Sequence, residues 1–146
     1  MDNPYDAPEL VQARKEQEDP WVMYLIVHES LGMSGGKTAA QTGHAVGMLF
    51  QQFYGVKLKQ LNPDVNFYRD NDFEHWLRDS YRKIVLKASD KEWNKLKTEL
   101  PRYTTMVMVR DAGLTEIEPG SETVIGVWPM KKSEAPKMIK RLQVLK

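Results

Sequence analysis

A lysine follows a glycine-rich turn in residues 32–45, which read GMSGGKTAAQTGHA. The apolar, β-rich run of residues 21–27 precedes this turn, and apolar side chains with helical spacing follow it. A strand, a glycine turn and a helix that begins at Lys37 place an ammonium group beside the unpaired backbone N–H groups of a helix start. That arrangement suits an anionic ligand, or the negative charge that develops during a reaction.

Two more polar side chains lie on the same stripe of this predicted helix. At about 100° per residue, Lys37, Gln41 and His44 fall within roughly 60° of one another. They combine a cation, an amide and an imidazole, which together could form a site. The structural alternative is that Lys37 is a solvated residue of the first turn and His44 a buried histidine with satisfied hydrogen bonds.

A second polar cluster occupies residues 109–120, VRDAGLTEIEPG, where a β-rich run leads to Asp111, then to a turn glycine and Thr115. Ligands of open α/β sheets bind outside the carboxyl ends of the strands. Asp111 and Lys37 therefore lie together if the strands before them are parallel. A carboxylate beside a lysine keeps both groups charged, and either could orient a water molecule. The alternative for Asp111 is a turn residue that caps its own backbone.

Other catalytic motifs fit the chain poorly. Gly36-Lys37-Thr38 matches the end of a P-loop, but Leu31 stands where the first glycine belongs and Gly32 lies one residue too close, so a nucleotidase is a disfavoured rival. Three histidines without a His-x3-His pair, and no cysteine, argue against zinc. We expect no metal.

The length and composition indicate a single domain of ordinary composition, since 146 residues can bury one core and 28% of them are charged. The absence of cysteine fits a reducing compartment. No apolar run reaches membrane-spanning length and no leader is recognisable, so we expect a cytoplasmic protein without an anchor.

Charge is unevenly distributed. Residues 1–20 contain six acidic and two basic residues, which predicts a flexible acidic tail with a net charge of −4. Because the whole chain carries +1, the predicted domain at 21–146 carries +5. Basic residues gather near its end: Lys131, Lys132, Lys137, Lys140, Arg141 and Lys146. They could contact a phosphate backbone or form a solvated helix face.

Strands alternate with helices, which predicts a layered α/β domain. The expected strands are 22–28, 83–88, 103–109 and 122–127, and the expected helices are 37–53, 73–81, 89–100 and 133–142. Asp72, Ser89 or Asp90, and Ser133 are the expected N-caps, and residues 54–71 the expected loop.

Helix 37–53 should pack on the sheet through one apolar stripe. Its members are Ala39, Val46, Leu49, Phe50 and Phe53. Three small residues, Ala40, Gly43 and Gly47, should permit a close approach between this helix and the sheet.

The two polar clusters together resemble the type 2 peptidyl-tRNA hydrolase family of archaea and eukaryotes. The first family motif reads roughly Arg-x-Asp-Leu-x-Met-x-x-Gly-Lys-x-Ala-Ala-Gln-x-x-His-Ala, and the second Asp-Ala-Gly-x-Thr-x-Ile-x-Pro-Gly-x-x-Thr. From the first, the chain keeps Leu31, Met33, Gly36, Lys37, Ala39, Ala40, Gln41, His44 and Ala45. From the second, it keeps Asp111, Ala112, Gly113, Thr115, Ile117, Pro119, Gly120 and Thr123. The resemblance covers about residues 22–146.

This resemblance implies a three-layer α/β/α sandwich with a small mixed sheet of about four strands. It implies hydrolysis of the ester bond between a peptide, or an N-blocked amino acid, and the 3′-end of tRNA. The implied catalytic residues are Lys37, Asp111 and Thr115, supported by Gly36, Gln41, His44, Gly113 and Thr123. The implied partner is peptidyl-tRNA, with no membrane and no metal or organic cofactor, and members are often homodimers.

The chain departs from the family at two positions, where His28 replaces the usual Arg and Ser30 the usual Asp. The stretch between Phe53 and Glu74 is also longer than usual. These departures leave one alternative open, a catalytically inactive RNA- or protein-binding member with the same fold.

Overall fold

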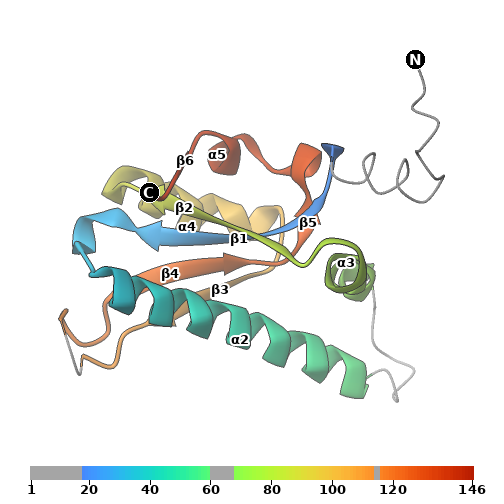
Figure 1. Cartoon of the computed structure of the whole chain (residues 1–146), viewed down its shortest axis with the longest axis horizontal. Helices are drawn as coiled ribbons and strands as arrows, with labels where there is room; N and C mark the ends of the chain where they lie inside the picture. Colours follow the sequence, from blue (N-terminus) through green and yellow to red (C-terminus); the bar gives the residue numbers. More distant parts are fainter. Residues whose placement is uncertain (1–17, 60–67, 114–115) are drawn as a thin grey trace, which may run out of the picture.

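A mixed β-sheet carries helices on both of its faces (Figure 1). The computed structural model describes residues 18–59, 68–113 and 116–146. The long strands are β1 (Trp21–His28), β2 (Arg82–Ala88), β3 (Met106–Arg110) and β4 (Glu122–Val127). Two strands of two residues each, β5 (Met130–Lys131) and β6 (Gln143–Val144), bring the described sheet to six strands rather than the expected four or so.

The strand order is β3-β4-β1-β2-β6, and β5 pairs with the start of β1. β1 is parallel to β2 and antiparallel to β4, and β4 is antiparallel to β3. β1 and β3 therefore run in the same direction, so both end at the same edge of the sheet. This confirms the condition under which Lys37 and Asp111 were expected to meet.

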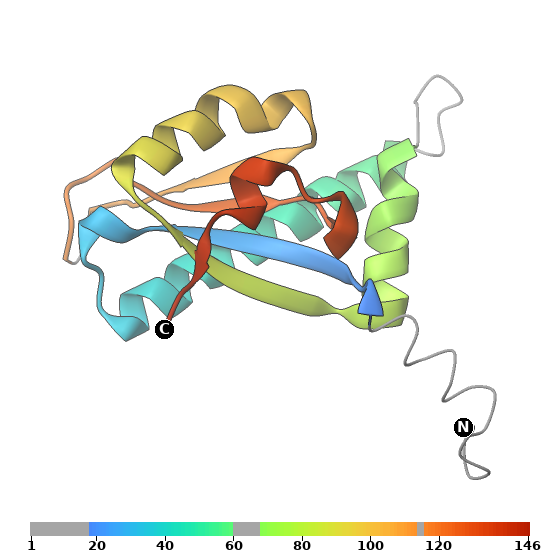
Figure 2. The same cartoon turned by 90° about the horizontal axis from the view of Figure 1, so that it is seen from above.

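One face of the sheet carries α2 (Gly35–Lys59), α3 (Tyr68–His75) and the π-helical turn η2 (Trp76–Ser80). The other face carries α4 (Asp90–Glu99) and α5 (Lys137–Lys140). Short 3-10 turns are η1 (Glu29–Leu31), η3 (Leu100–Arg102) and η4 (Lys132–Glu134). Figure 2 shows α3 at the end of the sheet where β1 begins.

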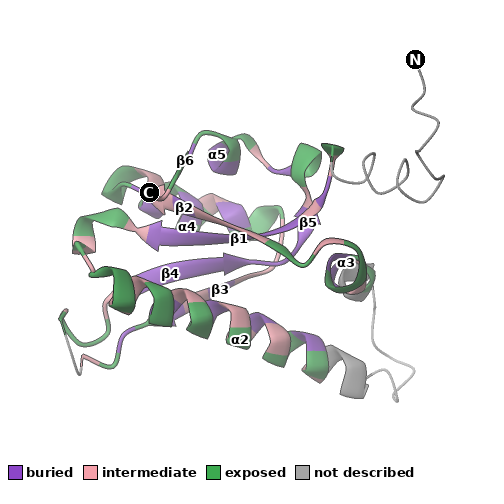
Figure 3. Ribbon diagram, viewed as in Figure 1, coloured by how far each residue is buried: buried purple, intermediate pink, exposed green. Residues whose placement is uncertain are grey.

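β1 is buried on both faces, as its nearly continuous apolar sequence predicts. Met23, Leu25 and Val27 belong to the core beneath α2, and Val22, Tyr24 and Ile26 to the core beneath α4. Figure 3 shows the buried strands between helices whose outer faces are exposed.

Helix α4 begins as predicted. The Ser89 hydroxyl accepts from the Glu92 N–H (3.3 Å), and the Glu92 carboxylate accepts from the Ser89 N–H (2.9 Å), which completes a capping box. Trp93, Leu96 and Leu100 are all buried, so the predicted inner face of this helix is confirmed.

The loop predicted at 54–71 is wrong at both ends, because α2 continues to Lys59 and α3 begins at Tyr68, while residues 60–67 lie outside the described chain. Asp72 consequently lies inside α3 and is not its N-cap. Aromatic packing joins the two helices, since Phe53 stacks on Phe73 with ring centroids 4.4 Å apart. The loop prediction failed because a polar composition indicates only solvent exposure, and the exposed face of a helix is as polar as a loop.

The helix predicted at 133–142 is also wrong in extent, because only Lys137–Lys140 is α-helical. A residue before proline is disfavoured in the α region, and Ala135, before Pro136, is extended with φ −60° and ψ 133°. Ser133 therefore caps no helix. Its N–H and hydroxyl donate instead to the Asp19 carboxylate at 2.9 and 2.8 Å. Of the predicted tail, residues 1–17 lie outside the described chain.

Two further expectations about packing and strand length fail. The predicted strand at 103–109 begins only at Met106, because the turn that follows η3 continues through Thr104: the Tyr103 and Thr104 N–H groups both donate to the Leu100 carbonyl. On α2, four residues expected to face the sheet are exposed: Ala39, Ala40, Gly43 and Gly47. The close approach is made by Gly126 of β4, where a Cβ would lie 3.2 Å from the Ala45 Cβ and 2.9 Å from Val107 Cγ2.

Candidate active site

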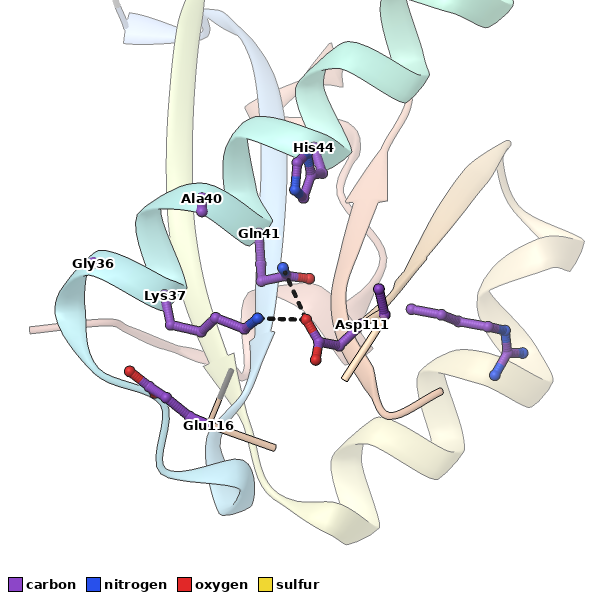
Figure 4. Close-up of a pocket in the computed structure, with 9 residues that line it drawn as sticks. Gly36, Lys37, Ala40, Gln41, His44, Asp111 and Glu116 are labelled. Atoms are coloured by element: carbon purple, nitrogen blue, oxygen red, sulfur yellow. Dashed lines mark hydrogen bonds and ion pairs between the residues drawn. The ribbon is translucent and has the colours of Figure 1, made fainter. Parts of the chain in front are cut away.

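Lys37 and Asp111 form an ion pair at the edge where β1 and β3 end (Figure 4). Lys37 lies in the first turn of α2, Asp111 directly follows β3, and Nζ is 2.5 Å from Oδ1. Both side chains are largely buried, with 11% and 4% of their surface exposed. The expectation that two residues 74 positions apart come together is confirmed.

The Asp111 carboxylate is held in a defined orientation by its own turn. The Gly113 N–H donates to Oδ2 at 2.7 Å, while the Asp111 carbonyl accepts from the Gly120 N–H at 2.8 Å. Gly113 has φ +79°, and a Cβ there would lie 2.7 Å from the Pro119 Cα, so only glycine fits. The support expected from Gly113 is therefore a backbone hydrogen bond.

These contacts keep Asp111 ionised. The hydrogen bond from Lys37 lowers the pKa of the Asp111 carboxyl below its ordinary value, and the Gly113 N–H and the charge of His44 act in the same direction. Burial opposes this shift without reversing it. The site thus presents a carboxylate and an ammonium group together.

Gln41 and Thr123 form a buried chain behind the ion pair. Gln41 Nε2 lies 3.4 Å from Asp111 Oδ1, and the Thr123 hydroxyl donates to Gln41 Oε1 at 2.7 Å. Gln41 is 4% exposed and Thr123 is fully buried. These contacts link β4 through α2 to the Asp111 carboxylate and bring together two of the predicted support residues.

The start of α2 is tied to the loop after β3 by Ser34 and Glu116. Ser34 Oγ accepts from the Lys37 N–H at 3.2 Å, as an N-cap does. Glu116 accepts from the Ser34 N–H at 3.0 Å and from its hydroxyl at 2.5 Å. These bonds lower the pKa of Glu116. Sequence reasoning missed both residues, although a serine three positions before Lys37 is a recognisable cap signal.

A pocket of about 480 Å³ opens over the ion pair. Its lining residues are Gly36, Lys37, Ala40, Gln41, His44, Arg110, Asp111, Ala112 and Glu116. His44 is exposed at this pocket, so its alternative interpretation as a buried histidine is wrong. Thr115, the third predicted catalytic residue, lies outside the described chain.

His28 and Ser30 join the end of β1 to the start of α4. His28 Nδ1 donates to the Glu122 carbonyl at 2.9 Å, and Nε2 lies 2.8 Å from Asp90 Oδ1. Ser30 donates to the same Asp90 oxygen at 2.6 Å, and the imidazole stacks on Trp93 at 4.3 Å. His28 and Ser30, the two residues that depart from the family motif, thus share Asp90 as a hydrogen-bond partner. Both hydrogen bonds lower the pKa of Asp90, and the bond from Ser30 has the larger effect.

Neither a metal cluster nor a membrane span is found in the described ranges. No three or more His, Cys, Asp or Glu side chains gather there in a way that could hold a metal ion. None of the helices in those ranges is long and apolar enough to cross a bilayer.

Comparison with known proteins agrees with the two motifs. The family model for peptidyl-tRNA hydrolase PTH2 matches residues 21–145. The peptidyl-tRNA hydrolase of Methanopyrus kandleri is 35% identical over 124 residues, covering 84% of this chain and 96% of that protein. The one from Methanocaldococcus jannaschii is 34% identical over 129 residues, covering 84% and 98%. Bos taurus mitochondrial peptidyl-tRNA hydrolase 2 is 33% identical over 112 residues, covering 73% and 54%. The chain therefore belongs to the peptidyl-tRNA hydrolase PTH2 family.

Proposed function

We propose that this chain hydrolyses the ester bond between a peptide and the 3′-end of tRNA, with Lys37 and Asp111 at the reacting centre. The observation that carries the assignment is the 2.5 Å ion pair between these two family-motif residues at the floor of an open pocket. Nothing in the comparisons favours the inactive binding member.

Hydrolysis adds a water oxygen to the ester carbonyl carbon, breaks the bond to the ribose oxygen and leaves a proton on that oxygen. Asp111 is our candidate for aligning this water. Because its pKa is lowered, the carboxylate is a weak base but a strong hydrogen-bond acceptor at neutral pH. Its role is then mainly orientation, which a fixed carboxylate performs well.

Lys37 is the candidate for stabilising the oxyanion of the tetrahedral intermediate. Its ammonium lines the pocket with little exposure, and a partly dehydrated cation acts more strongly than one in water. Gly36 lines the same pocket at the helix start. Gln41 and Thr123 hold Asp111 from behind, and His44 at the rim is positioned to assist the departing ribose oxygen with a proton.

Further parts of the proposal rest on the family resemblance. They are the three-layer α/β/α arrangement, a role for Thr115 at the site, action in the cytoplasm on stalled peptidyl-tRNA, and assembly as a homodimer. Helices on both faces of the sheet support the first. Sedimentation of the full chain tests the last.

Release of labelled N-acetyl-amino acid from N-acetyl-aminoacyl-tRNA tests the function. We expect release by the wild type and its loss in folded Lys37→Ala and Asp111→Asn. Lys87→Ala is the matched control, because Lys87, like Lys37, is a lysine of intermediate burial that forms an ion pair, here with Glu29 at 3.1 Å. A wild type that binds tRNA but releases nothing would establish the binding-protein alternative instead.

A further inference from the structure

A second hollow, of about 460 Å³, continues from the candidate active site along α2 and β3. Its lining residues are Gly43, His44, Gly47, Met48 and Gln51 of α2, and Met108, Val109 and Arg110 of β3. We call it the β3 groove. His44 and Arg110 line both this groove and the pocket over Asp111, so the two spaces adjoin.

Two glycines of α2 keep this groove open. Gly43 and Gly47 are exposed, and a Cβ built on either would meet no atom within 4 Å. Glycine inside a helix is less favourable than alanine, because it costs more backbone entropy. Packing on the sheet does not require these glycines, whereas larger side chains there would project toward the open space.

The other wall of the groove is a sheet edge. β3 is the last strand of the described sheet on this side. Trp128 N–H donates to the Thr105 carbonyl, so by the alternation of an antiparallel ladder Met106, Met108 and Arg110 direct their backbone groups away from β4. Such an edge is a template for an added strand.

We propose that the β3 groove binds the last residues of the peptide part of peptidyl-tRNA as an extended strand beside β3. This inference rests on the proposed function. With the scissile ester at Asp111, the peptide runs back along β3 toward Met106, which makes it parallel to that strand. From Gly43 to Gln51 the helix rises about 12 Å, the length of three to four extended residues.

The chemistry of the groove fits a peptide better than the tRNA. A phosphate backbone needs cations, and Arg110 is the one Lys or Arg among the described lining residues. Arg110 is itself paired with Glu122 at 3.2 Å. An edge strand binds an added strand mainly through backbone hydrogen bonds. This mode suits a substrate whose peptide sequence varies. The exposed helix start near Lys37, on the other side of Asp111, suits a terminal phosphate.

The test compares two substrates on the same tRNA, N-acetyl-aminoacyl-tRNA and N-acetyl-tetrapeptidyl-tRNA. In Gly47→Leu we expect the ratio of kcat/KM for the long substrate to that for the short one to fall about tenfold, mainly through KM. Gly55→Leu is the matched control on the same helix, since Gly55 does not line the groove and a Cβ there also meets nothing. That control should keep the wild-type ratio.

A second pair of variants guards against a folding defect. Gln51→Trp fills the end of the groove far from Asp111 and should lower the same ratio, whereas Gln52→Trp, its exposed neighbour outside the groove, should not. Equal losses on both substrates would overturn the inference, since the shared tRNA would then occupy the groove. Sedimentation showing that Gly47→Leu splits a dimer would also overturn it, by assigning the edge to a second copy. A wild type inactive on both substrates would instead refute the proposed function.

Discussion

Glu116 binds Ser34 across the mouth of the site, accepting from its backbone N–H at 3.0 Å and from its hydroxyl at 2.5 Å. The two residues are 82 positions apart, one in the loop after β3 and the other at the N-cap of α2. The loop that carries Asp111 and the helix that carries Lys37 are thereby joined a second time, outside the Lys37–Asp111 ion pair.

Removing this tie should loosen the geometry of the site. We expect Glu116→Ala to lower kcat/KM for N-acetyl-aminoacyl-tRNA by roughly 10- to 100-fold, because small misplacements of reacting groups have effects of that size. Initial rates and Tm are the measurements. Glu118→Ala, which changes an exposed glutamate of the same loop, is the control. Equal activity in both variants would show that the tie does not position the site.

Asp111→Asn should lower turnover by more than ~10²-fold while the fold survives. The amide keeps the size of the side chain but removes the charge that pairs with Lys37 and aligns the water. Single-turnover release and circular dichroism check this. The control is Asp79→Asn, at an exposed carboxylate that faces His75. A folded Asp111→Asn with near-normal turnover contradicts the role assigned here.

The meeting of Lys37 and Asp111 could be predicted from the sequence, because it needs only two parallel strands that end at one edge. The buried β1 and the capping box at Ser89 were equally accessible, since each is a local pattern. The last two features depend on short-range rules that the amino-acid order displays directly, whereas the first was predicted only on the condition that the two strands are parallel.

Other features depend on contacts that no local pattern reports. Strands β5 and β6, with two residues each, are too short to show a period. The Glu116–Ser34 tie joins distant segments. The apolar stripe of α2 was predicted in large part, since Leu49 and Phe53 are buried and Val46 and Phe50 pack against the same core. The small residues were misjudged, because Gly43 and Gly47 suggest close packing in sequence, whereas Gly126 on the facing strand makes it.

Thr123→Val should separate support from catalysis. Valine has a similar shape but cannot donate to Gln41 Oε1, which is then buried without its partner at a cost of about 1–3 kcal/mol in the free energy of unfolding. We expect lower stability in urea and a reduced kcat, because Gln41 contacts Asp111. Thr123→Ser keeps the hydroxyl and should restore most of the kcat. If Thr123→Ser lowered kcat as much as Thr123→Val does, the loss would come from altered packing and not from the missing hydroxyl.

The protein should lose stability as the pH falls below about 4.5, the ordinary range of Asp and Glu. Hydrogen bonds in the folded state lower the pKa values of Asp90, Asp111 and Glu116. A lowered pKa stabilises the fold above the unfolded-state value, and this contribution is lost as the pH falls through the folded-state value. Urea unfolding between about pH 3 and about pH 6 measures this loss of stability, because that range covers the ordinary pKa values of Asp and Glu.

Two variants test the sign of this dependence. Glu116→Gln should make the loss of stability in acid shallower, because it removes one carboxyl whose pKa is lowered in the folded state. Asp72→Asn should make it steeper, since burial raises the pKa of Asp72 and its protonation in acid favours the fold. Parallel curves for the two variants would contradict the assignment of opposite shifts.

Salt dependence should reveal whether the basic end of the chain contacts tRNA. Lys132, Lys137 and Lys140 are exposed on η4 and α5, on the opposite face of the sheet from α2. If each meets a phosphate, the slope of log K against log salt changes by about 0.9 per contact, the value for a B-form duplex, so a triple glutamine variant should flatten it by roughly two to three. Filter binding of uncharged tRNA with the wild type and this variant measures both slopes. Lys91→Gln/Lys95→Gln on α4 is the control pair. An unchanged slope in the triple variant would show that these three lysines do not contact tRNA phosphates.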